Sequence, residues 1–195
     1  MRTIILATTN QGKIAEIREL LDGIAEIVLP DNLPNVVEDG SSLAENAYKK
    51  AKSAADFLNL EAVADDSGLF VEGINGMPGV HSARYAGNDA DDYSNRQKLL
   101  AELAEVENRK AYFSTVICLC SPHQAFQEAN FFEGRCQGTI SWEEIGTNGF
   151  GYDSIFVPDD GDGRTFAQMN SAEKAKYSHR ARAIEQFKNA LRSGL

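Results

Sequence analysis

The sequence is poor in cysteine and begins without a long hydrophobic run. Its three cysteines, Cys118, Cys120 and Cys136, form no C-x-x-C pair. An odd number of cysteines without paired spacing excludes a disulfide framework and a standard zinc knuckle. The first apolar run, Ile4 to Ala7, is too short for a signal peptide or a membrane span. We therefore expect a soluble, cytoplasmic protein with reduced thiols and no membrane partner.

Basic residues are also in the minority. The chain has 19 lysines and arginines against 29 aspartates and glutamates, which gives a net charge of -10. Such a field repels nucleic-acid backbones and anionic lipids, so neither is expected as a partner. Segment 171–195 is an exception, because it holds six basic residues and two acidic ones. A small phosphate-bearing ligand can still bind where basic residues gather in this way.

The length and composition indicate one globular domain. Of the 195 residues, 43% are hydrophobic and 25% are charged, as in folded soluble proteins. A chain of this length buries roughly 70% of the surface that its unfolded form exposes, so a substantial core is available. We predict a single domain over residues 1–195, built from two lobes with a cleft between them.

Strand-like and helix-like segments alternate along the chain. The continuous apolar run at 4–7 predicts a buried strand, and apolar residues at helical spacing predict a helix over 14–21. Further strands are predicted over 26–29, 62–65, 69–71 (after a Ser-Gly turn), 110–120, 125–133 and 138–141, with a loop at 73–79. Further helices are predicted over 42–58 (with Ser42 and Glu45 as a capping box), 93–104 (behind Asp91 and Asp92) and 170–191 (with Asn170 as N-cap and Glu173 at N3). This order predicts the α/β class, with a long mixed sheet flanked by helices.

A polar turn at residues 8–13 joins the first predicted strand to the first predicted helix. Its sequence is Thr-Thr-Asn-Gln-Gly-Lys. Such a turn directs backbone N–H groups and the Lys13 ammonium to one concave place, where phosphate binds well. The spacing matches neither a P-loop nor a G-x-G-x-x-G motif. An ordinary strand-to-helix turn is the alternative interpretation.

Two adjacent carboxylates, Asp65 and Asp66, end a predicted strand. Because side chains alternate along a strand, we expect one in the cleft and the other, on the opposite side, in hydrogen bonds of the turn. A carboxylate beside a phosphate implies Mg²⁺, a hard cation that takes oxygen ligands. Glu38 is a candidate second ligand, with Asp39 as its alternative, whereas Glu45 serves the helix cap. A solvated acidic turn is the other interpretation of the aspartate pair.

An aromatic segment and a basic helix are the remaining candidates. In Gly149–Asp153 the glycines allow the backbone to approach a flat ligand, and the two aromatic rings can stack on it. Core aromatics before a strand are the alternative. Lys174, His179 and Arg180 are the basic candidates. A helix turns about 100° per residue, so Lys174 and His179 lie about 140° apart and share no narrow face of one helix. A solvated basic helix is the alternative.

Taken in order, these motifs resemble the inosine/xanthosine triphosphate pyrophosphatase (ITPase) family. The matching segments are LATTNQGK at 6–13, ENA at 45–47, ADDSG at 64–68, PGVHSARYAG at 78–87, GFGYD at 149–153 and SHR at 178–180. The resemblance therefore covers nearly the whole chain. It implies a two-lobed fold around a long mixed sheet and a homodimer. It also implies Mg²⁺-dependent cleavage of ITP, dITP and XTP to the nucleoside monophosphate and pyrophosphate.

The resemblance also implies roles for individual residues. Asp66 would be the general base and a metal ligand, and Ser67 would touch the substrate. The residues that would hold the triphosphate are Thr8, Thr9, Asn10, Gln11, Gly12 and Lys13. Phe150, Gly151, Tyr152 and Asp153 would line the base pocket, and Lys174, His179 and Arg180 would contact the base or the sugar-phosphate. Lys50 and Arg84 are further candidates for phosphate contact. Thr9 and Asn148 stand where the family often has glycine.

Three rival interpretations remain at this point. A related pyrophosphatase could act on pyrimidine or modified nucleotides, but segments 150–153 and 178–180 match the purine enzymes. A nucleotide sensor without hydrolysis would be marked by the loss of Asp66 or Lys13, and both are present. A P-loop enzyme that cleaves the γ-phosphate would need the Walker spacing, which the sequence lacks.

Overall fold

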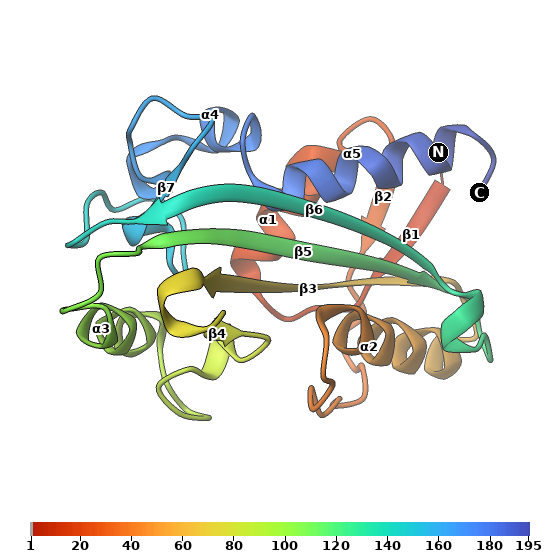
Figure 1. Ribbon diagram of the computed structural model, residues 1–195. Helices are drawn as coiled ribbons and strands as arrows, with labels where there is room; N and C mark the ends of the chain where they lie inside the picture. Colours follow the sequence, from red (N-terminus) through yellow and green to blue (C-terminus); the bar gives the residue numbers. More distant parts are fainter. Residues whose placement is uncertain (1) are drawn as a thin grey trace. The chain divides into compact units, whose positions relative to one another are not determined.

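The computed structural model describes residues 2–195 and has a mixed α/β architecture (Figure 1). The helices are α1 (Gln11–Leu21), α2 (Leu43–Leu58), α3 (Asp92–Glu102), α4 (Ser171–Ala175) and α5 (His179–Arg192). The strands are β1 (Arg2–Leu6), β2 (Ala25–Val28), β3 (Ala62–Val71), β4 (Pro78–Gly79), β5 (Lys110–Cys120), β6 (Asn130–Ile140) and β7 (Phe156–Pro158). They form one sheet in the order β2-β1-β3-β5-β6-β7, with β4 paired to β3. The predicted fold class is confirmed.

The sheet is mixed because its pairings run in both directions. β1 pairs in parallel with β2 and with β3, and the register places Ile5 opposite Val28 on one side and opposite Ala62 on the other. β3 pairs antiparallel with β4, and β6 pairs antiparallel with β7. In the parallel part each connection passes through a helix, α1 or α2, as parallel pairs require.

The chain folds as two compact units. The first unit comprises the residues up to Asp66, then 115–134 and 182–195. The second comprises 67–114 and 135–181. The strands β3, β5 and β6 and the helix α5 each contribute residues to both units.

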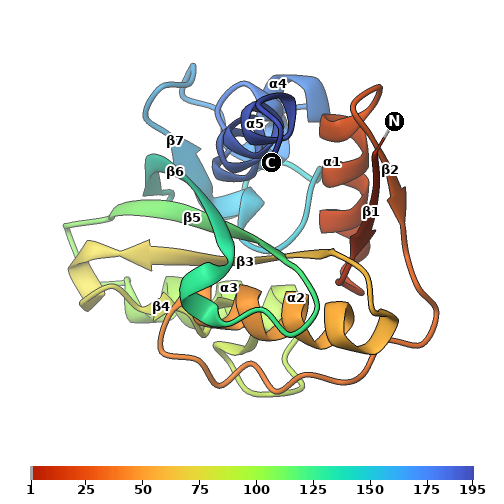
Figure 2. The same ribbon diagram turned by 90° about the vertical axis from the view of Figure 1, so that its right-hand side faces the viewer.

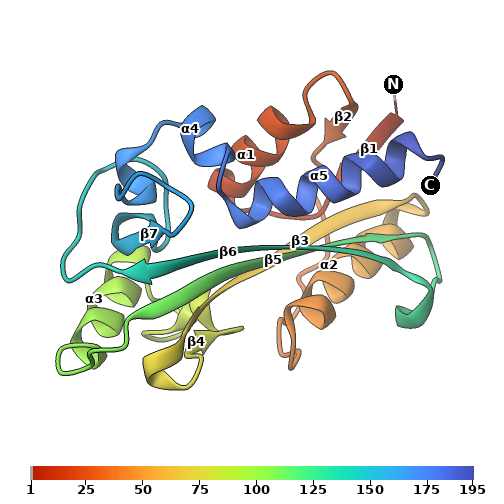
Figure 3. The same cartoon turned by 45° about the horizontal axis from the view of Figure 1, so that its top comes forward.

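Strand alternation sorts the core of the first unit into two layers. Ile4 and Leu6 belong to the apolar cluster formed with α1 and α5, whereas Ile5 belongs to the cluster formed with α2. In this unit α1 and α5 lie on one side of the strands and α2 on the other (Figures 1 and 3). Figure 2 shows α1 running beside β1 and β2. The α2 face consists of small residues that allow close packing, namely Ala47, Ala51, Ala54 and Ala55.

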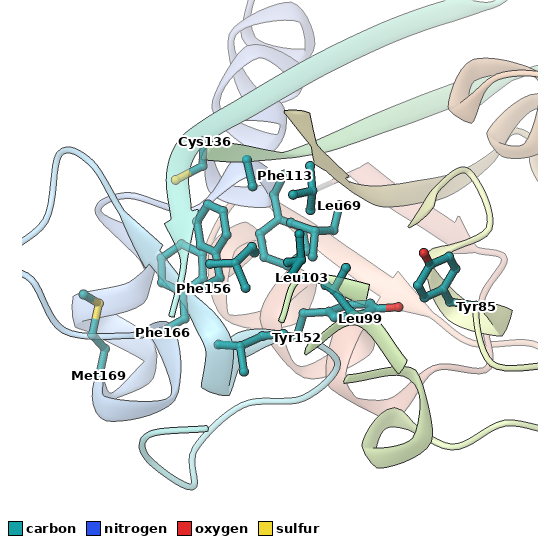
Figure 4. Close-up of a cluster of buried hydrophobic side chains, with 14 residues drawn as sticks. Leu69, Tyr85, Leu99, Leu103, Phe113, Cys136, Tyr152, Phe156, Phe166 and Met169 are labelled. Atoms are coloured by element: carbon teal, nitrogen blue, oxygen red, sulfur yellow. The ribbon is translucent and has the colours of Figure 1, made fainter. Parts of the chain in front are cut away.

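The core of the second unit is rich in aromatic side chains (Figure 4). Phe113 of β5 packs against Phe156 of β7, with ring centroids 4.6 Å apart. Leu99 and Leu103 contribute from α3 and from the residue after it, and both are fully buried. Burial of each such side chain contributes roughly 1.5–3 kcal/mol to the free energy of folding. This core supports the polar residues of the same unit.

The Ser-Gly turn predicted within 62–71 is absent, because β3 continues through it as one strand. Gly68 is needed there for close approach: a Cβ at this position would stand 2.5 Å from the carbonyl oxygen of Gly79 on β4. The Ser82 hydroxyl accepts a hydrogen bond from the Leu69 backbone N–H at 2.8 Å, which supports the strand at the same point. The predicted loop at 73–79 is correspondingly shorter, since β4 occupies its last two residues.

Two predicted strands were also placed wrongly. Residues 126–128 form a short 3-10 turn, because the Glu128 carboxylate accepts a hydrogen bond from the Ala125 backbone N–H at 2.9 Å. The strand β6 begins only at Asn130. It then runs without interruption to Ile140, so it takes in most of the segment predicted as a separate strand at 138–141.

The long helix predicted over 170–191 is broken into α4 and α5. The Asn170 cap is confirmed, since its side chain accepts from the Glu173 N–H and the Glu173 carboxylate accepts from the Asn170 N–H, both at 2.9 Å. Residues 176–178 then interrupt the helix, and the Ser178 hydroxyl accepts from the Ala181 N–H at 3.1 Å at the start of α5. Lys174 and His179 therefore lie on different helices, and the angle expected for one straight helix does not apply. Within residues 2–195, the helices all fall short of the length and apolar character needed to cross a membrane.

Candidate active site

The turn at residues 8–13 leads directly into the first turn of α1. Asn10 is the N-cap: its Oδ1 accepts a hydrogen bond from the Lys13 backbone N–H at 3.0 Å. The Thr8 hydroxyl accepts from the Asn10 N–H at 3.2 Å. Thr9, Asn10 and Gln11 are exposed, and Gly12 is half-buried. The turn thus presents a helix N-terminus and polar side chains to solvent, an arrangement that suits an anion.

Asp65 and Asp66 lie on opposite faces of β3, as alternation predicts. Asp65 meets α1, where its Oδ2 lies 3.0 Å from the Lys13 ammonium. Asp66 meets α2, where its Oδ2 accepts from the Asn46 side-chain amide at 3.1 Å and its Oδ1 lies 3.4 Å from the Lys50 ammonium. Both aspartates are buried within the strand and not at its end, because β3 continues to Val71. Asp65 is correspondingly paired with a lysine from another element, in place of the turn that was predicted.

Lys50 joins Asp66 to Glu38. Its ammonium lies 3.2 Å from Glu38 Oε2 and 3.4 Å from Asp66 Oδ1. Burial tends to lower the pKa of Lys50, but the nearby carboxylates, Asp66 foremost, outweigh it and raise the pKa above its usual value. Burial raises the pKa of Asp66, and the charges of Lys50 and Lys13 offset only part of that rise. A buried carboxylate of this kind is a stronger base than an exposed one, which suits it to accept a proton from water.

The carboxylate chemistry around Lys50 fits a hard divalent cation. Glu38 and Asp66 reach the same ammonium, so their oxygens lie close enough to share one positive charge. Asp39 pairs with Lys49 instead, and Glu45 accepts from Ser41. Over residues 2–195, no group of three or more histidines, cysteines, aspartates and glutamates is arranged to hold a metal. One or two carboxylates are nevertheless enough for Mg²⁺ when substrate phosphates complete its coordination.

The second unit gathers its polar candidates around Phe150. Lys174 and Asp153 form a buried ion pair, with Nζ to Oδ2 at 2.6 Å. The Lys174 ammonium lies 5.0 Å from the centroid of the Phe150 ring, and the Arg180 guanidinium lies 5.7 Å from it. Arg180 also donates to the Ser67 hydroxyl at 3.0 Å. The arrangement offers buried hydrogen-bond donors beside an aromatic face, which suits a flat, polar-edged ligand.

Local backbone geometry explains the glycines of segment 149–153. Gly149 has φ of +74°, and a Cβ there would stand 2.0 Å from Asp153 Oδ2. The same carboxylate oxygen accepts from the Phe150 backbone N–H at 3.0 Å. Asp153 therefore fixes the loop and Lys174 together, which only glycine at position 149 permits. The segment's other aromatic, Tyr152, is part of the core cluster.

His179 and Arg84 differ from the other candidates in their surroundings. The His179 ring is buried and stacks on Phe113, with centroids 4.5 Å apart. Arg84 lies in the short 3-10 turn Ser82–Arg84, with its Nη2 3.4 Å from His81 Nδ1. The turn that contains Arg84 also contacts segment 149–153, because the Tyr152 hydroxyl donates a hydrogen bond to the Ser82 carbonyl oxygen at 2.7 Å.

One site residue was missed by the sequence analysis. Asn46 is completely buried in α2, and its side chain accepts from the Gly40 N–H at 2.8 Å while it donates to Asp66 at 3.1 Å. Asn46 thereby links the loop before α2 to Asp66. Asn46 could have been found from its position in the ENA segment at 45–47, which is one of the segments that match the family, although no role was assigned to it.

Comparisons with known proteins agree over almost the entire chain. The Ham1 family profile matches residues 4–190. A protein named dITP/XTP pyrophosphatase from Desulfotalea psychrophila is 46% identical over 189 residues, covering 95% of this chain and 83% of that protein. A protein of the same name from Haemophilus influenzae is 44% identical over 193 residues, covering 96% and 98%. The solved structure of a HAM1 protein from Coxiella burnetii matches with a TM-score of 0.89 and 38% identity, with 100% of both chains covered.

Proposed function

The chain belongs to the Ham1 family, and from that premise we propose that it is a pyrophosphatase of non-standard purine nucleoside triphosphates. It hydrolyses dITP, XTP and ITP to the nucleoside monophosphate and pyrophosphate, which clears deaminated purines from the nucleotide pool. The observation that carries the proposal is the match of the whole chain to relatives named dITP/XTP pyrophosphatase. The 44–46% identity extends over 95–96% of this chain, and the family profile spans residues 4–190, a range that contains each of the motifs described above.

Asp66 is the proposed general base. Its carboxylate orients a water molecule toward the α-phosphorus and takes a proton from it as the new oxygen–phosphorus bond forms. The bond between the α-phosphorus and the bridging oxygen breaks, and pyrophosphate leaves. The raised pKa of Asp66 and its fixed position between Asn46 and Lys50 support this role. Positioning and charge stabilisation supply most of the rate in such reactions.

Mg²⁺ is the proposed cofactor, held by Asp66 and Glu38. When bound, it neutralises charge that develops on the phosphate oxygens. The residues proposed to hold the triphosphate are Thr8, Thr9, Asn10, Gln11, Gly12 and Lys13. Lys13 and Lys50 bring two ammonium groups to the aspartate pair, from α1 and α2. These charges balance the carboxylates, so that a polyanionic substrate is not repelled.

The base edge determines selectivity. Hypoxanthine and xanthine carry a 6-keto oxygen and an N1–H, whereas adenine carries a 6-amino group and a bare N1. A buried donor such as Arg180 or Lys174 is satisfied by the keto oxygen and faces another donor in adenine. A buried donor left without an acceptor costs roughly 1–3 kcal/mol. Phe150 supplies the stacking face, Gly151 and Asp153 line the pocket, and Ser67 and His179 complete the substrate-binding set. Tyr152, expected to line the pocket as well, belongs to the core cluster and supports this segment from there.

The protein is further proposed to act as a homodimer in the cytoplasm, as the resemblance implies. The three cysteines are buried thiols that form no disulfide within residues 2–195, in keeping with a reducing compartment.

A substrate panel tests the proposed function. XTP, dITP, ITP, GTP, ATP and UTP are each incubated with Mg²⁺ or with EDTA, and the nucleotides are separated. We expect XTP, dITP and ITP to be cleaved with kcat/KM at least about 100-fold above that for ATP, since each mismatched donor contributes to the discrimination. EDTA should remove the activity. Equal turnover of ATP, or undiminished turnover in EDTA, would contradict the proposed substrate class or the proposed cofactor.

A further inference from the structure

Both backbone groups of Gly151 are held by one face of α3. The Asp92 carboxylate accepts a hydrogen bond from the Gly151 N–H at 2.7 Å. The Arg96 guanidinium donates to the Gly151 carbonyl oxygen, also at 2.7 Å. Residues four apart on a helix project from the same face, so α3 grips this peptide segment with two adjacent side chains. This pair of contacts is called the Gly151 clamp below.

We propose that Asp92 and Arg96 are positioning residues that determine affinity and selectivity for the purine base by fixing segment 149–153. The inference rests on the proposed function, because it assigns base recognition to Phe150 and its neighbours. Neither Asp92 nor Arg96 is proposed to touch the substrate. Both act through the backbone of Gly151.

Gly151 depends on polar contacts for its position. Its φ is +60°, a conformation that favours glycine, and no heavy atom outside its chain neighbours lies within 4 Å of the place where a Cβ would stand. A side chain at position 151 would therefore have no neighbour to pack against, and packing cannot fix the loop at this point. The clamp supplies what packing does not, with one charged acceptor for the N–H and one charged donor for the carbonyl. Hydrogen bonds to charged groups are stronger than those between neutral groups.

Arg96 is itself anchored. Its Nε donates to Glu144 Oε2 at 2.8 Å, while its Nη1 serves Gly151. The Ser154 hydroxyl donates to the same Glu144 oxygen at 3.0 Å. The guanidinium thus links Gly151 to Glu144, and Glu144 contacts Ser154, the residue that follows segment 149–153. A lysine has a single ammonium group on a flexible side chain, so it cannot donate to Glu144 and to Gly151 in the same planar geometry.

The clamp connects directly to the proposed base-recognition residues. Gly151 follows Phe150, whose ring faces the Lys174 and Arg180 cations. The Phe150 N–H is fixed on the other side by Asp153, the partner of Lys174. Release of Gly151 therefore frees one end of the stacking residue while leaving its cationic partners in place. Because the chemistry is assigned to Asp66 and not to this loop, the loss falls on substrate binding and leaves the chemical step unchanged.

Four variants test the clamp. Arg96→Lys and Asp92→Leu each remove one of its contacts, Asp92→Asn keeps an acceptor oxygen, and Gln97→Ala is the matched control. Gln97 lies on the same helix and donates to the other oxygen of Glu144, at 2.9 Å, without a contact to Gly151. The measurements are kcat and KM for XTP and ATP, equilibrium binding of XTP with EDTA present, and the melting temperature.

We expect Arg96→Lys and Asp92→Leu to raise KM for XTP about tenfold with kcat within about twofold of wild type, as loss of a binding contact predicts. The preference for XTP over ATP should narrow, Asp92→Asn should recover most of the lost affinity, and Gln97→Ala should match wild type. Wild-type KM and XTP binding in both clamp variants would overturn the inference. A parallel fall in kcat and melting temperature that Asp92→Asn does not rescue would also overturn it, because it would show a purely structural role.

Failure of the clamp inference and failure of the proposed function give different results. If the wild-type protein released no pyrophosphate from XTP, the proposed function would fail. The binding measurement would still decide the clamp: weaker XTP binding in Arg96→Lys and Asp92→Leu, but not in Gln97→Ala, supports it, and equal binding in all four overturns it.

Discussion

Asp66→Asn is expected to lower kcat for XTP by roughly 10²- to 10⁴-fold, the usual contribution of a positioned general base. Asparagine has nearly the same shape as aspartate, so the packing of β3 against α2 is retained. It has no carboxylate to accept the proton of the attacking water, and it is a weaker metal ligand. Lys50 keeps Glu38 as a partner at 3.2 Å, which limits the effect on folding. The measurement is the initial rate of pyrophosphate release, with circular dichroism to verify the fold.

Asp39→Asn is the control for this experiment. Asp39 lies next to Glu38 in the sequence, its side chain is 70% exposed and its ion-pair partner is Lys49. A neutral side chain at this position should change kcat little, since an exposed ion pair is worth about 0–1 kcal/mol even to stability. Full activity in Asp66→Asn would refute the assignment of the base. Loss of activity in Asp39→Asn would instead transfer the metal-ligand role from Glu38 to its neighbour.

Lys174→Met is expected to destabilise the protein by about 3–5 kcal/mol, the usual cost of breaking a buried ion pair from one side. The Lys174 and Asp153 side chains are only 8% and 5% exposed, so the remaining carboxylate would lose its 2.6 Å partner in a poorly hydrated place. Because Asp153 also holds the Phe150 N–H, XTP binding should weaken as well. The measurement is the free energy of unfolding from a urea titration monitored by circular dichroism.

Lys176→Met supplies the comparison for this loss. Lys176 is two residues farther along, is exposed, and lies in the break between α4 and α5. Exposed substitutions of this kind usually change stability by no more than about 0.5 kcal/mol. If Lys174→Met and Lys176→Met unfolded at the same urea concentration, the buried pair would not stabilise the fold, and only its proposed part in base recognition would remain.

The features that the sequence predicts well are those controlled by local periodicity. Alternation along one strand is enough to separate Asp65 from Asp66, and the structure places them against α1 and α2 respectively. Side-chain capping is equally local, which is why the Asn170 cap was predictable. At Ser42 the prediction holds only in part. Its hydroxyl accepts from the Glu45 N–H, but the Glu45 carboxylate reaches Ser41 instead of completing the box.

The features that the sequence did not predict depend on residues far apart in the chain. Gly68 looks like a turn residue until Gly79 is seen to pack against it from β4. The break after α4 carries one local signal, Ser178, whose hydroxyl accepts from the Ala181 N–H at the start of α5. A single serine inside a predicted helix does not mark a break by itself. The clamp on Gly151 joins positions 59 and 55 residues apart. Such contacts are decided by tertiary packing, which a local pattern does not contain.

Isotopically labelled water distinguishes attack at the α-phosphorus from attack at either of the other two phosphorus atoms. The protein is incubated with XTP and Mg²⁺ in water enriched in the heavy oxygen isotope, and the products are examined by mass spectrometry. Attack at the α-phosphorus places the heavy oxygen in the nucleoside monophosphate and leaves pyrophosphate unlabelled. Label in pyrophosphate would move the attack to the β-phosphorus, and labelled orthophosphate with a nucleoside diphosphate would move it to the γ-phosphorus. Either result would contradict the mechanism.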